Sequence, residues 1–157
     1  MGTTSSRTLY AAEATVTGGR SEGSGRTSDG MLEVMLRLPP EMGGEGGGTN
    51  PEQLFAVGYA ACFEGALGVV AQRLKQEVGD VAIESRVMLL AMEQRGFNLA
   101  VALNVTLPSV DDVAAAAELV RAAHQVCPYS NATRGNIDVS LTANGRRVGE
   151  PSDPVGA

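Results

Sequence analysis

A chain of 157 residues with 43% hydrophobic content is typical of one globular domain, so residues 1–157 are expected to form a single domain with its own core. Its formal net charge of −6 at pH 7 argues against nucleic acid or an anionic membrane surface as the main partner. The first residues lack the hydrophobic core of a signal peptide and no apolar run looks long enough to cross a bilayer, so we expect a cytoplasmic protein.

Two β-strands are predicted in the first 40 residues. Leu9–Thr17 and Met31–Leu38 both contain alternating, β-compatible residues. The segment between them is rich in glycine and polar residues, which predicts a loop, and it carries Arg20 and Arg26. A glycine-rich run at residues 43–48 follows as a flexible connection, because it lacks the lysine and hydroxyl residue of a phosphate-binding loop.

The longest predicted element is a helix from Pro51 to about Gln76. Asn50 can cap it, and proline suits the first helical position, where its missing N–H costs nothing. Small and apolar residues recur at helical spacing along one face: Leu54, Gly58, Ala61, Cys62, Gly65, Ala66 and Val69. Glycines inside a helix reduce its stability, so this face is expected to pack closely against another backbone, with Cys62 at its buried centre.

The second half of the chain begins with a predicted β-hairpin. Val81–Met92 and Asn98–Leu107 are its strands, and residues 94–96 are its turn. A second helix is expected over Asp111–Cys127, started by a capping box of Ser109 with Asp112. Apolar alternation on the second hairpin strand indicates that one face of the sheet is buried.

The end of the chain is predicted to contain one more strand. Pro128 should stop the second helix, and Asn136–Ala143 reads as a short strand. The tail from Asn144 is rich in glycine, proline and charge and is expected to be loosely ordered. The resulting order, two strands, helix, two strands, helix and strand, predicts an α+β fold with a mostly antiparallel sheet and two main helices.

Two cysteines, Cys62 and Cys127, are the only thiols in the chain. They are far apart in sequence and neither belongs to a C-x-x-C pair, so each could be a small buried hydrophobe. A redox pair is equally open, since a transient disulfide requires only that the fold bring the two residues together. A reactive thiol needs a nearby cation, and Arg20, preceded by two glycines, is favoured over Arg26 for that role.

Glu52 lies ten residues before Cys62 in the same predicted helix. On a straight helix this separation is about 15 Å, so Glu52 cannot touch Cys62 of its own helix. It could serve the thiol only if the helix is broken or if a second subunit supplies the carboxylate. The alternative is that Glu52 simply favours the helix dipole from the first turn.

His124 and Cys127 are three residues apart and share a helix face, which raises the alternative of metal binding. Together with Cys62 and a carboxylate they would complete a tetrahedral zinc site. No standard ligand spacing supports this site, and a partly buried packing role for His124 is the simpler interpretation.

Two long motifs tell more about the protein family than the two cysteines do alone. Asn50–Leu67 and Val126–Val139 resemble the signature segments of the organic hydroperoxide resistance proteins, a group within the OsmC-like family. Gly18–Arg20, Ser28–Gly30 and Gly96–Pro108 fit the same pattern in the same order. The resemblance covers nearly the whole chain.

This resemblance implies a thiol-dependent peroxidase in an intertwined homodimer. Cys62 matches the peroxidatic cysteine and Cys127 the resolving cysteine, while Arg20 matches the arginine that stabilises the thiolate and Glu52 the glutamate that holds this arginine. The implied substrates are alkyl and fatty-acid hydroperoxides. No bound metal or cofactor is implied, and the implied reductant is a dihydrolipoamide-type dithiol on a lipoylated protein.

Two rival interpretations accompany this one. The sister OsmC subgroup has the same chemistry with a different substrate preference. A non-catalytic protein on the same scaffold, binding either zinc through thiolates or an apolar ligand, belongs to another class. Leu54, Phe55, Phe63 and Met42 are the apolar residues expected to line a pocket for an alkyl chain.

Overall fold

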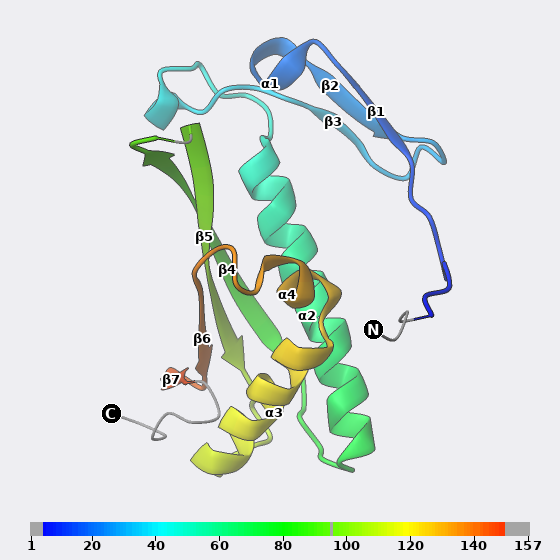
Figure 1. Ribbon diagram of the computed structural model, residues 1–157, viewed down its shortest axis with the longest axis vertical. Coiled ribbons are helices and arrows are strands. Elements are labelled where there is room, and N and C mark those ends of the chain that lie inside the picture. Colours follow the sequence, from blue (N-terminus) through cyan, green and yellow to red (C-terminus); the bar gives the residue numbers. More distant parts are fainter. Residues whose placement is uncertain (1–4, 95, 150–157) are drawn as a thin grey trace. The chain divides into compact units, whose positions relative to one another are not determined.

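The computed structural model describes residues 5–94 and 96–149. The chain forms two compact units, Met1–Pro51 and Glu52–Ala157 (Figure 1). The expectation that residues 1–157 form a single domain stays a prediction.

The first unit contains a small antiparallel sheet. Its strands are β1 (Ala14–Thr17), β2 (Ser24–Thr27) and β3 (Glu33–Met35), in the order β1-β2-β3. A four-residue helix, α1 (Gly19–Glu22), joins the first two strands, and a short 3-10 helix (Pro40–Met42) follows the third. The two strands predicted from sequence are therefore present but shorter than expected.

The segment predicted to be only a loop is structured, and the prediction was wrong there. It holds α1 and β2, and glycines make this compact arrangement feasible. Gly18 and Gly19 have φ angles of 78° and 70°, which favour glycine. A Cβ atom on Gly23 would lie 2.1 Å from the carbonyl oxygen of Gly19, so only glycine fits where the chain leaves α1. These glycines, interpreted as loop residues, instead close a tight turn.

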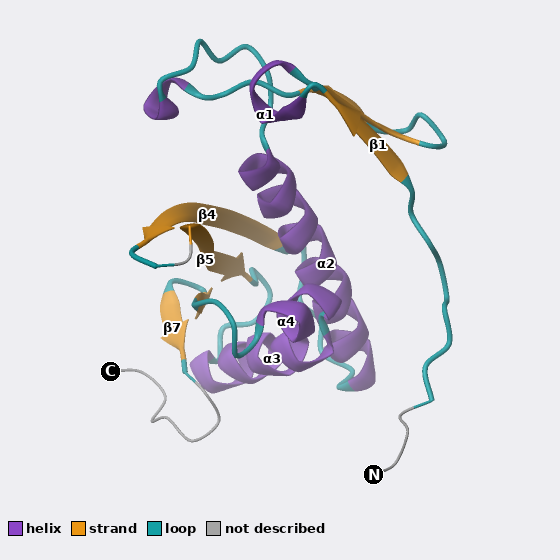
Figure 2. Ribbon diagram, turned by 45° about the horizontal axis from the view of Figure 1, so that its top comes forward, coloured by secondary structure: helices purple, strands orange, loops and turns teal. Residues whose placement is uncertain are grey.

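The second unit contains three helices and a four-stranded sheet. The helices are α2 (Pro51–Arg73), α3 (Val113–Val126) and α4 (Pro128–Thr133). The strands are β4 (Ala82–Met92), β5 (Gly96–Thr106), β6 (Val139–Ala143) and β7 (Arg146–Val148). Figures 1 and 2 show the three helices on the same face of the sheet.

The sheet has the order β4-β5-β6-β7. β4 and β5 form the predicted antiparallel hairpin, with Val87 opposite Val101 and Met92 opposite Gly96. Arg95, in the predicted turn, lies outside the described residues. β6 pairs parallel to β5, with Leu103 opposite Leu141, because α3 and α4 form the crossover between them. The prediction of an α+β fold with a mostly antiparallel sheet is confirmed.

The region after β6 was predicted less well. β7 pairs antiparallel with β6, so the chain after Asn144 continues as a strand where a loosely ordered tail was expected. The Asn144 side chain accepts from the Leu107 amide at 2.7 Å and donates to the Val110 carbonyl at 2.9 Å, which anchors the turn before β7. Residues 150–157 of the predicted tail lie outside the described residues.

The junction of α3 and α4 also differs from the prediction. Asp112 is the N-cap of α3 and accepts a hydrogen bond from the Ala115 amide at 2.8 Å, in place of the expected box with Ser109. Pro128 does end α3, but it also begins α4, which the sequence interpretation missed. Proline is favoured at a first helical position as well as after a helix end, so a single proline can separate two helices.

The buried face of α2 is not the one predicted. Among the residues assigned to that face, only Ala66 is buried, while Ala61, Gly65 and Val69 are exposed in this chain. The buried residues of α2 are Tyr59, Phe63, Ala66, Leu67, Val70 and Ala71. Because α2 is apolar around most of its circumference, its sequence pattern could not select the core-facing side. Cys62 is half-buried, at the border between the two faces.

The core of the second unit joins α2, α3 and the sheet. Its fully buried members include Phe63 of α2, Leu103 of β5 and Val120 of α3. By length and composition alone α2 could cross a membrane, contrary to the sequence expectation of no such run. Its buried side chains belong to the shared core, which is the usual position of an apolar helix in a globular unit.

Candidate functional site

The fold brings the two cysteines together. The Sγ atom of Cys62, in α2, lies 3.5 Å from the Sγ atom of Cys127, between α3 and α4. Both thiols are free, and Cys127 is completely buried whereas Cys62 is half-buried. Cys62 is therefore the more accessible sulfur of the pair, and the Cys127 thiol donates toward it.

The start of α4 places a second group against Cys62. Cys127 has an extended backbone conformation and caps α4, and its carbonyl accepts from the Asn131 amide at 3.0 Å. The backbone N–H of Tyr129, in the first turn of α4, donates a hydrogen bond to the Cys62 thiol. Cys62 therefore faces both a thiol and an amide from one short helix.

The groups around Cys62 shift the pKa of its thiol in opposite directions. Burial raises the pKa of the Cys62 thiol above its ordinary value of 9.0, and the neighbouring Cys127 raises it further. The Tyr129 N–H opposes both effects because it stabilises the thiolate. The net direction is upward, so this local setting alone keeps Cys62 protonated at neutral pH.

Three aromatic rings lie together beside the cysteines. Phe55 and Tyr59 of α2 meet edge to face at 5.7 Å, and Phe55 stacks on Tyr129 at 5.8 Å between ring centroids. Gly58 makes room for this arrangement, since a Cβ atom there would lie 3.1 Å from the Tyr129 hydroxyl oxygen. Tyr129 is partly exposed, so the cluster presents an apolar surface near the more accessible thiol.

The expected pocket lining is only partly correct. Phe55 and Leu54 are half-buried on α2, but Phe63 is fully buried in the core and cannot line an open pocket. Met42 belongs to the first unit and is exposed there. The sequence interpretation missed the exposed Tyr129, although it lies inside the second signature segment.

A buried polar cluster lies behind the cysteine pair. The Ser130 hydroxyl lies 2.9 Å from the Tyr59 hydroxyl and 2.8 Å from Nδ1 of His124. Thr133 Oγ1 lies 3.2 Å from the same Tyr59 hydroxyl and donates to the Tyr129 carbonyl at 2.9 Å. His124 thus takes part in a hydrogen-bonded cluster, a role that its spacing from Cys127 did not reveal.

Zinc ligation was the alternative for His124. Throughout residues 5–94 and 96–149, no three histidine, cysteine or acidic side chains gather in a group that could hold a metal ion. The zinc interpretation therefore lacks a ligand set in that part of the chain.

Arg20 and Glu52 belong to different units. Arg20 is half-buried in α1 of the first unit, and Glu52 is half-buried in the first turn of α2. α2 continues unbroken from Pro51 to Arg73, so the broken-helix alternative for Glu52 is wrong. Their proposed roles toward Cys62 stay predictions.

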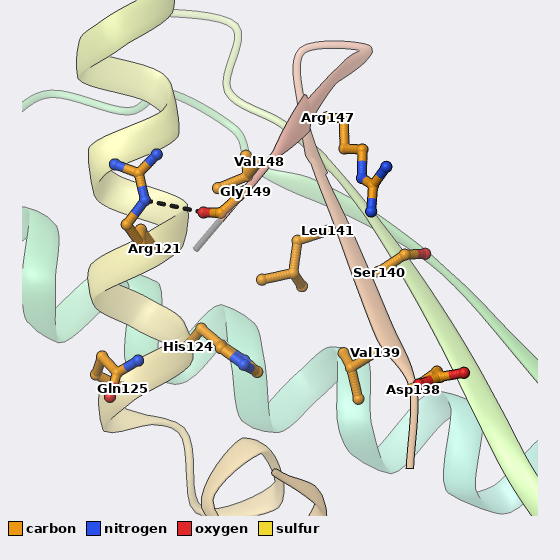
Figure 3. A pocket seen from close by; sticks show the side chains of 10 residues that line it. All are labelled: Arg121, His124, Gln125, Asp138, Val139, Ser140, Leu141, Arg147, Val148 and Gly149. Carbon is orange, nitrogen blue, oxygen red and sulfur yellow. Dashed lines mark hydrogen bonds between the residues drawn. The ribbon is translucent and has the colours of Figure 1, made fainter. Parts of the chain in front are cut away.

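A separate cavity of about 490 Å³ lies between α3 and the β6–β7 strands. Figure 3 shows its lining, with Arg121 donating to the Gly149 carbonyl and the His124 ring at its α3 side. No cysteine lines this cavity, so it is distinct from the thiol pair. His124 is the residue that lines it and also contacts Ser130.

The sequence is similar to named proteins over most of its length. Residues 44–142 match the family described as OsmC-like protein. An organic hydroperoxide resistance protein of Xanthomonas axonopodis pv. citri is 54% identical over 87% of this chain and 95% of its own length. The organic hydroperoxide resistance protein OhrB of Bacillus subtilis is 47% identical over 85% of this chain and 96% of its own.

Solved structures agree with this assignment. The crystal structure of an organic hydroperoxide resistance protein from Legionella pneumophila matches with a TM-score of 0.82 at 50% identity, covering 86% of this chain and 97% of that one. A similar protein from Vibrio cholerae, with captopril bound in one of its active sites, matches with a TM-score of 0.84 at 47% identity, covering 90% and 96%. The chain therefore belongs to the organic hydroperoxide resistance group of the OsmC-like family.

Proposed function

We propose that this protein is a cysteine-based peroxidase that reduces organic hydroperoxides to alcohols. The observation that carries the proposal is the 3.5 Å distance between the Sγ atoms of Cys62 and Cys127. A disulfide requires about 2.05 Å between the sulfur atoms, so the bond can form after a local movement of about 1.5 Å. The sequence similarity to organic hydroperoxide resistance proteins supports the same activity.

In the first step the Cys62 thiolate attacks the terminal oxygen of the hydroperoxide. The O–O bond breaks, the alkoxide takes a proton and leaves as the alcohol, and Cys62 becomes a sulfenic acid. Cys62 fits the attacking role because it is the more exposed of the two thiols. The sulfur is oxidised because it donates the electron pair that reduces the peroxide.

In the second step Cys127 resolves the sulfenic acid. Its sulfur attacks Cys62, the S–S bond forms, and the sulfenic oxygen leaves as water with the Cys127 proton. Complete burial of Cys127 suits this role, because external oxidants cannot reach it easily. Closing the disulfide also prevents a second hydroperoxide from oxidising Cys62 to the sulfinic acid.

Arg20 supplies the positive charge that the thiol pair lacks, and Glu52 holds Arg20 in place. Because burial and Cys127 raise the pKa of Cys62, a reactive thiolate needs a cation from outside its own neighbourhood. Arg20 would stabilise the thiolate and the charge that develops as the O–O bond breaks, and Glu52 would orient the guanidinium. No step in this scheme requires a bound metal or cofactor.

The aromatic cluster suits an apolar substrate. Phe55 and Tyr129 would offer ring faces to an alkyl or aryl group while the peroxide oxygen reaches Cys62, and the buried Tyr59 ring packs behind them. Alkyl and fatty-acid hydroperoxides are therefore the proposed substrates, as opposed to hydrogen peroxide, which has no group to occupy this surface.

A homodimer is proposed as the working form. Gly65 and Gly68 on α2 are exposed, and apart from their chain neighbours and the backbone of α2 itself, no atom of the described chain lies within 4 Å of the position of a Cβ on either. Glycine at two such positions costs helix stability without a benefit inside one chain. Close approach of a second copy would explain both, and it would let one subunit contribute Arg20 or Glu52 to the other.

The proposed reductant is a dihydrolipoamide-type dithiol, carried by a lipoylated protein in the cytoplasm. The test is steady-state turnover of cumene hydroperoxide with dihydrolipoamide, compared with glutathione as a control reductant. Turnover should require dihydrolipoamide and should vanish in Cys62→Ser. Equal turnover by Cys62→Ser would overturn the proposal.

A further inference from the structure

Ser130 is a fully buried hydroxyl at the centre of three helices. It lies in α4, and its Oγ atom is 2.9 Å from the Tyr59 hydroxyl of α2 and 2.8 Å from Nδ1 of His124 in α3. One side chain therefore fastens α4 to both of the longer helices. Tyr59 is also fully buried, so water does not compete for these hydrogen bonds.

The cluster has enough protons and lone pairs for every contact. Thr133 donates to the Tyr129 carbonyl, which leaves its oxygen free to accept from the Tyr59 hydroxyl. Tyr59 can then accept from Ser130, and Ser130 can accept from Nδ1–H of His124. This direction satisfies all four groups, with the His124 proton on Nδ1.

The clamped helix is too short to hold its own position. α4 has 6 residues, fewer than an isolated helix needs to be stable. Its start carries Cys127, whose sulfur lies 3.5 Å from Cys62. Ser130 is only three residues from Cys127, so movement of this side chain would be passed directly to the sulfur.

We propose that Tyr59, Ser130 and His124 form a positioning cluster that holds the Cys127 sulfur within reach of Cys62 for the resolving step. The proposal rests on the peroxidase function proposed above. The hydrogen bonds of Ser130 to Tyr59 and His124 join α4 to α2 and α3, so the cluster acts on the sulfur atoms through the start of α4. The cluster should therefore govern how the sulfenic acid partitions between Cys127 and a second hydroperoxide.

This partition is measurable after the sulfenic acid has formed. The reduced protein is mixed with a series of cumene hydroperoxide concentrations, and the disulfide and sulfinic forms are separated by intact mass. The ratio of sulfinic to disulfide product reports the resolving rate against over-oxidation. A variant that only slows formation of the sulfenic acid leaves this ratio unchanged.

Ser130→Ala removes both hydrogen bonds of the Ser130 hydroxyl and should raise the ratio about tenfold or more. Tyr59→Phe keeps the aromatic ring and should raise it in the same direction, which preserves the test if Ser130→Ala does not fold. His124→Asn places an amide N–H near the position of Nδ1 and should restore a ratio that His124→Ala raises.

Thr142→Ala, which loses a 2.9 Å hydrogen bond to Asn104 away from the thiols, is the control and should match the unmodified protein.

If the unmodified protein forms its disulfide, and Ser130→Ala and Tyr59→Phe give the same ratio of sulfinic to disulfide product as the unmodified protein, the positioning role is overturned. An equal rise in Thr142→Ala would also overturn it, because general loosening would then explain the effect. If the unmodified protein forms neither product, the peroxidase function itself fails, and the positioning role fails with it.

Discussion

At the residue scale, Cys62 lies in surroundings that oppose its own ionisation. Burial and the Cys127 thiol raise its pKa, and only the Tyr129 N–H acts the other way. An attacking thiolate at neutral pH therefore depends on a cation beyond these groups, and Arg20 is the proposed one. This dependence makes Arg20 the most informative side chain to remove.

Arg20→Ala should raise the Cys62 pKa above the ordinary thiol value of 9.0, because the remaining effects act upward. Reaction with iodoacetamide in the Cys127→Ser background, followed against pH, reports this pKa directly. At pH 7 the variant should react about tenfold more slowly or worse. Arg26→Ala is the control, and an equal loss in that variant would transfer the role away from Arg20.

The same substitution should reverse the pH dependence of stability. In Arg20→Ala the folded pKa of Cys62 exceeds the unfolded one, so the folded state binds more protons and stability falls as pH rises above 9.0. Where Arg20 depresses the folded pKa of Cys62, as proposed, the Cys62 contribution is instead lost as pH falls through that pKa. Urea unfolding of both proteins, each compared with its Cys62→Ala form, isolates this contribution, and identical slopes would contradict the role of Arg20.

Cys127→Ser should retain the first step and lose the second. Its sulfenic acid has no resolving thiol at 3.5 Å, so one equivalent of hydroperoxide is consumed and further oxidant gives the sulfinic acid. The yield of alcohol per protein and the product mass check both statements. Sustained turnover of Cys127→Ser with dihydrolipoamide would show that Cys127 is not required.

At the element scale, α2 shows what sequence periodicity could and could not predict. Its start at Pro51 was predicted, because proline and a preceding asparagine are local signals. Its buried face was not, since Val57 and Val69 are as apolar as Phe63 and Leu67, and only tertiary contacts decide which side meets the core. Cys62 was expected at the centre of the buried face, whereas it is half-buried at the border of that face.

α4 was missed for a related reason. Six residues after a proline carry too little periodicity to indicate a helix, and the contacts that hold them come from Tyr59 and His124, far away in sequence. The proximity of Cys62 and Cys127 likewise could not be derived from their spacing, because it depends on how α2 and α3 pack. The family motifs supplied the pairing that local patterns could not.

Gly58 links α2 to the aromatic cluster in a testable way. Gly58→Ala adds a Cβ atom 3.1 Å from the Tyr129 hydroxyl, so Tyr129 must move and its N–H should shift from Cys62. We expect hydroperoxide reduction to slow about fivefold, equivalent to about 1 kcal/mol. Adding Tyr129→Phe removes the nearest contact and should recover part of the rate, measured as a double-mutant cycle. Purely additive effects would argue against this contact.

At the scale of the whole molecule, the exposed small residues of α2 are the proposed interface with a second copy. Gly65→Leu fills space that is empty in one chain and should separate the proposed dimer in sedimentation experiments. Ala114→Leu adds similar bulk at an exposed position of α3 and should remain dimeric. A Gly65→Leu protein that sediments like the unmodified one would place the interface elsewhere.

The central claim is that Cys62 and Cys127 act as one redox pair toward organic hydroperoxides. The most direct measurement is rapid mixing of the reduced protein with one equivalent of cumene hydroperoxide, followed by thiol counting and peptide mass mapping. The account predicts loss of both thiols and a single disulfide between Cys62 and Cys127 within one chain. Two unchanged thiols, or a disulfide only between subunits, would contradict it.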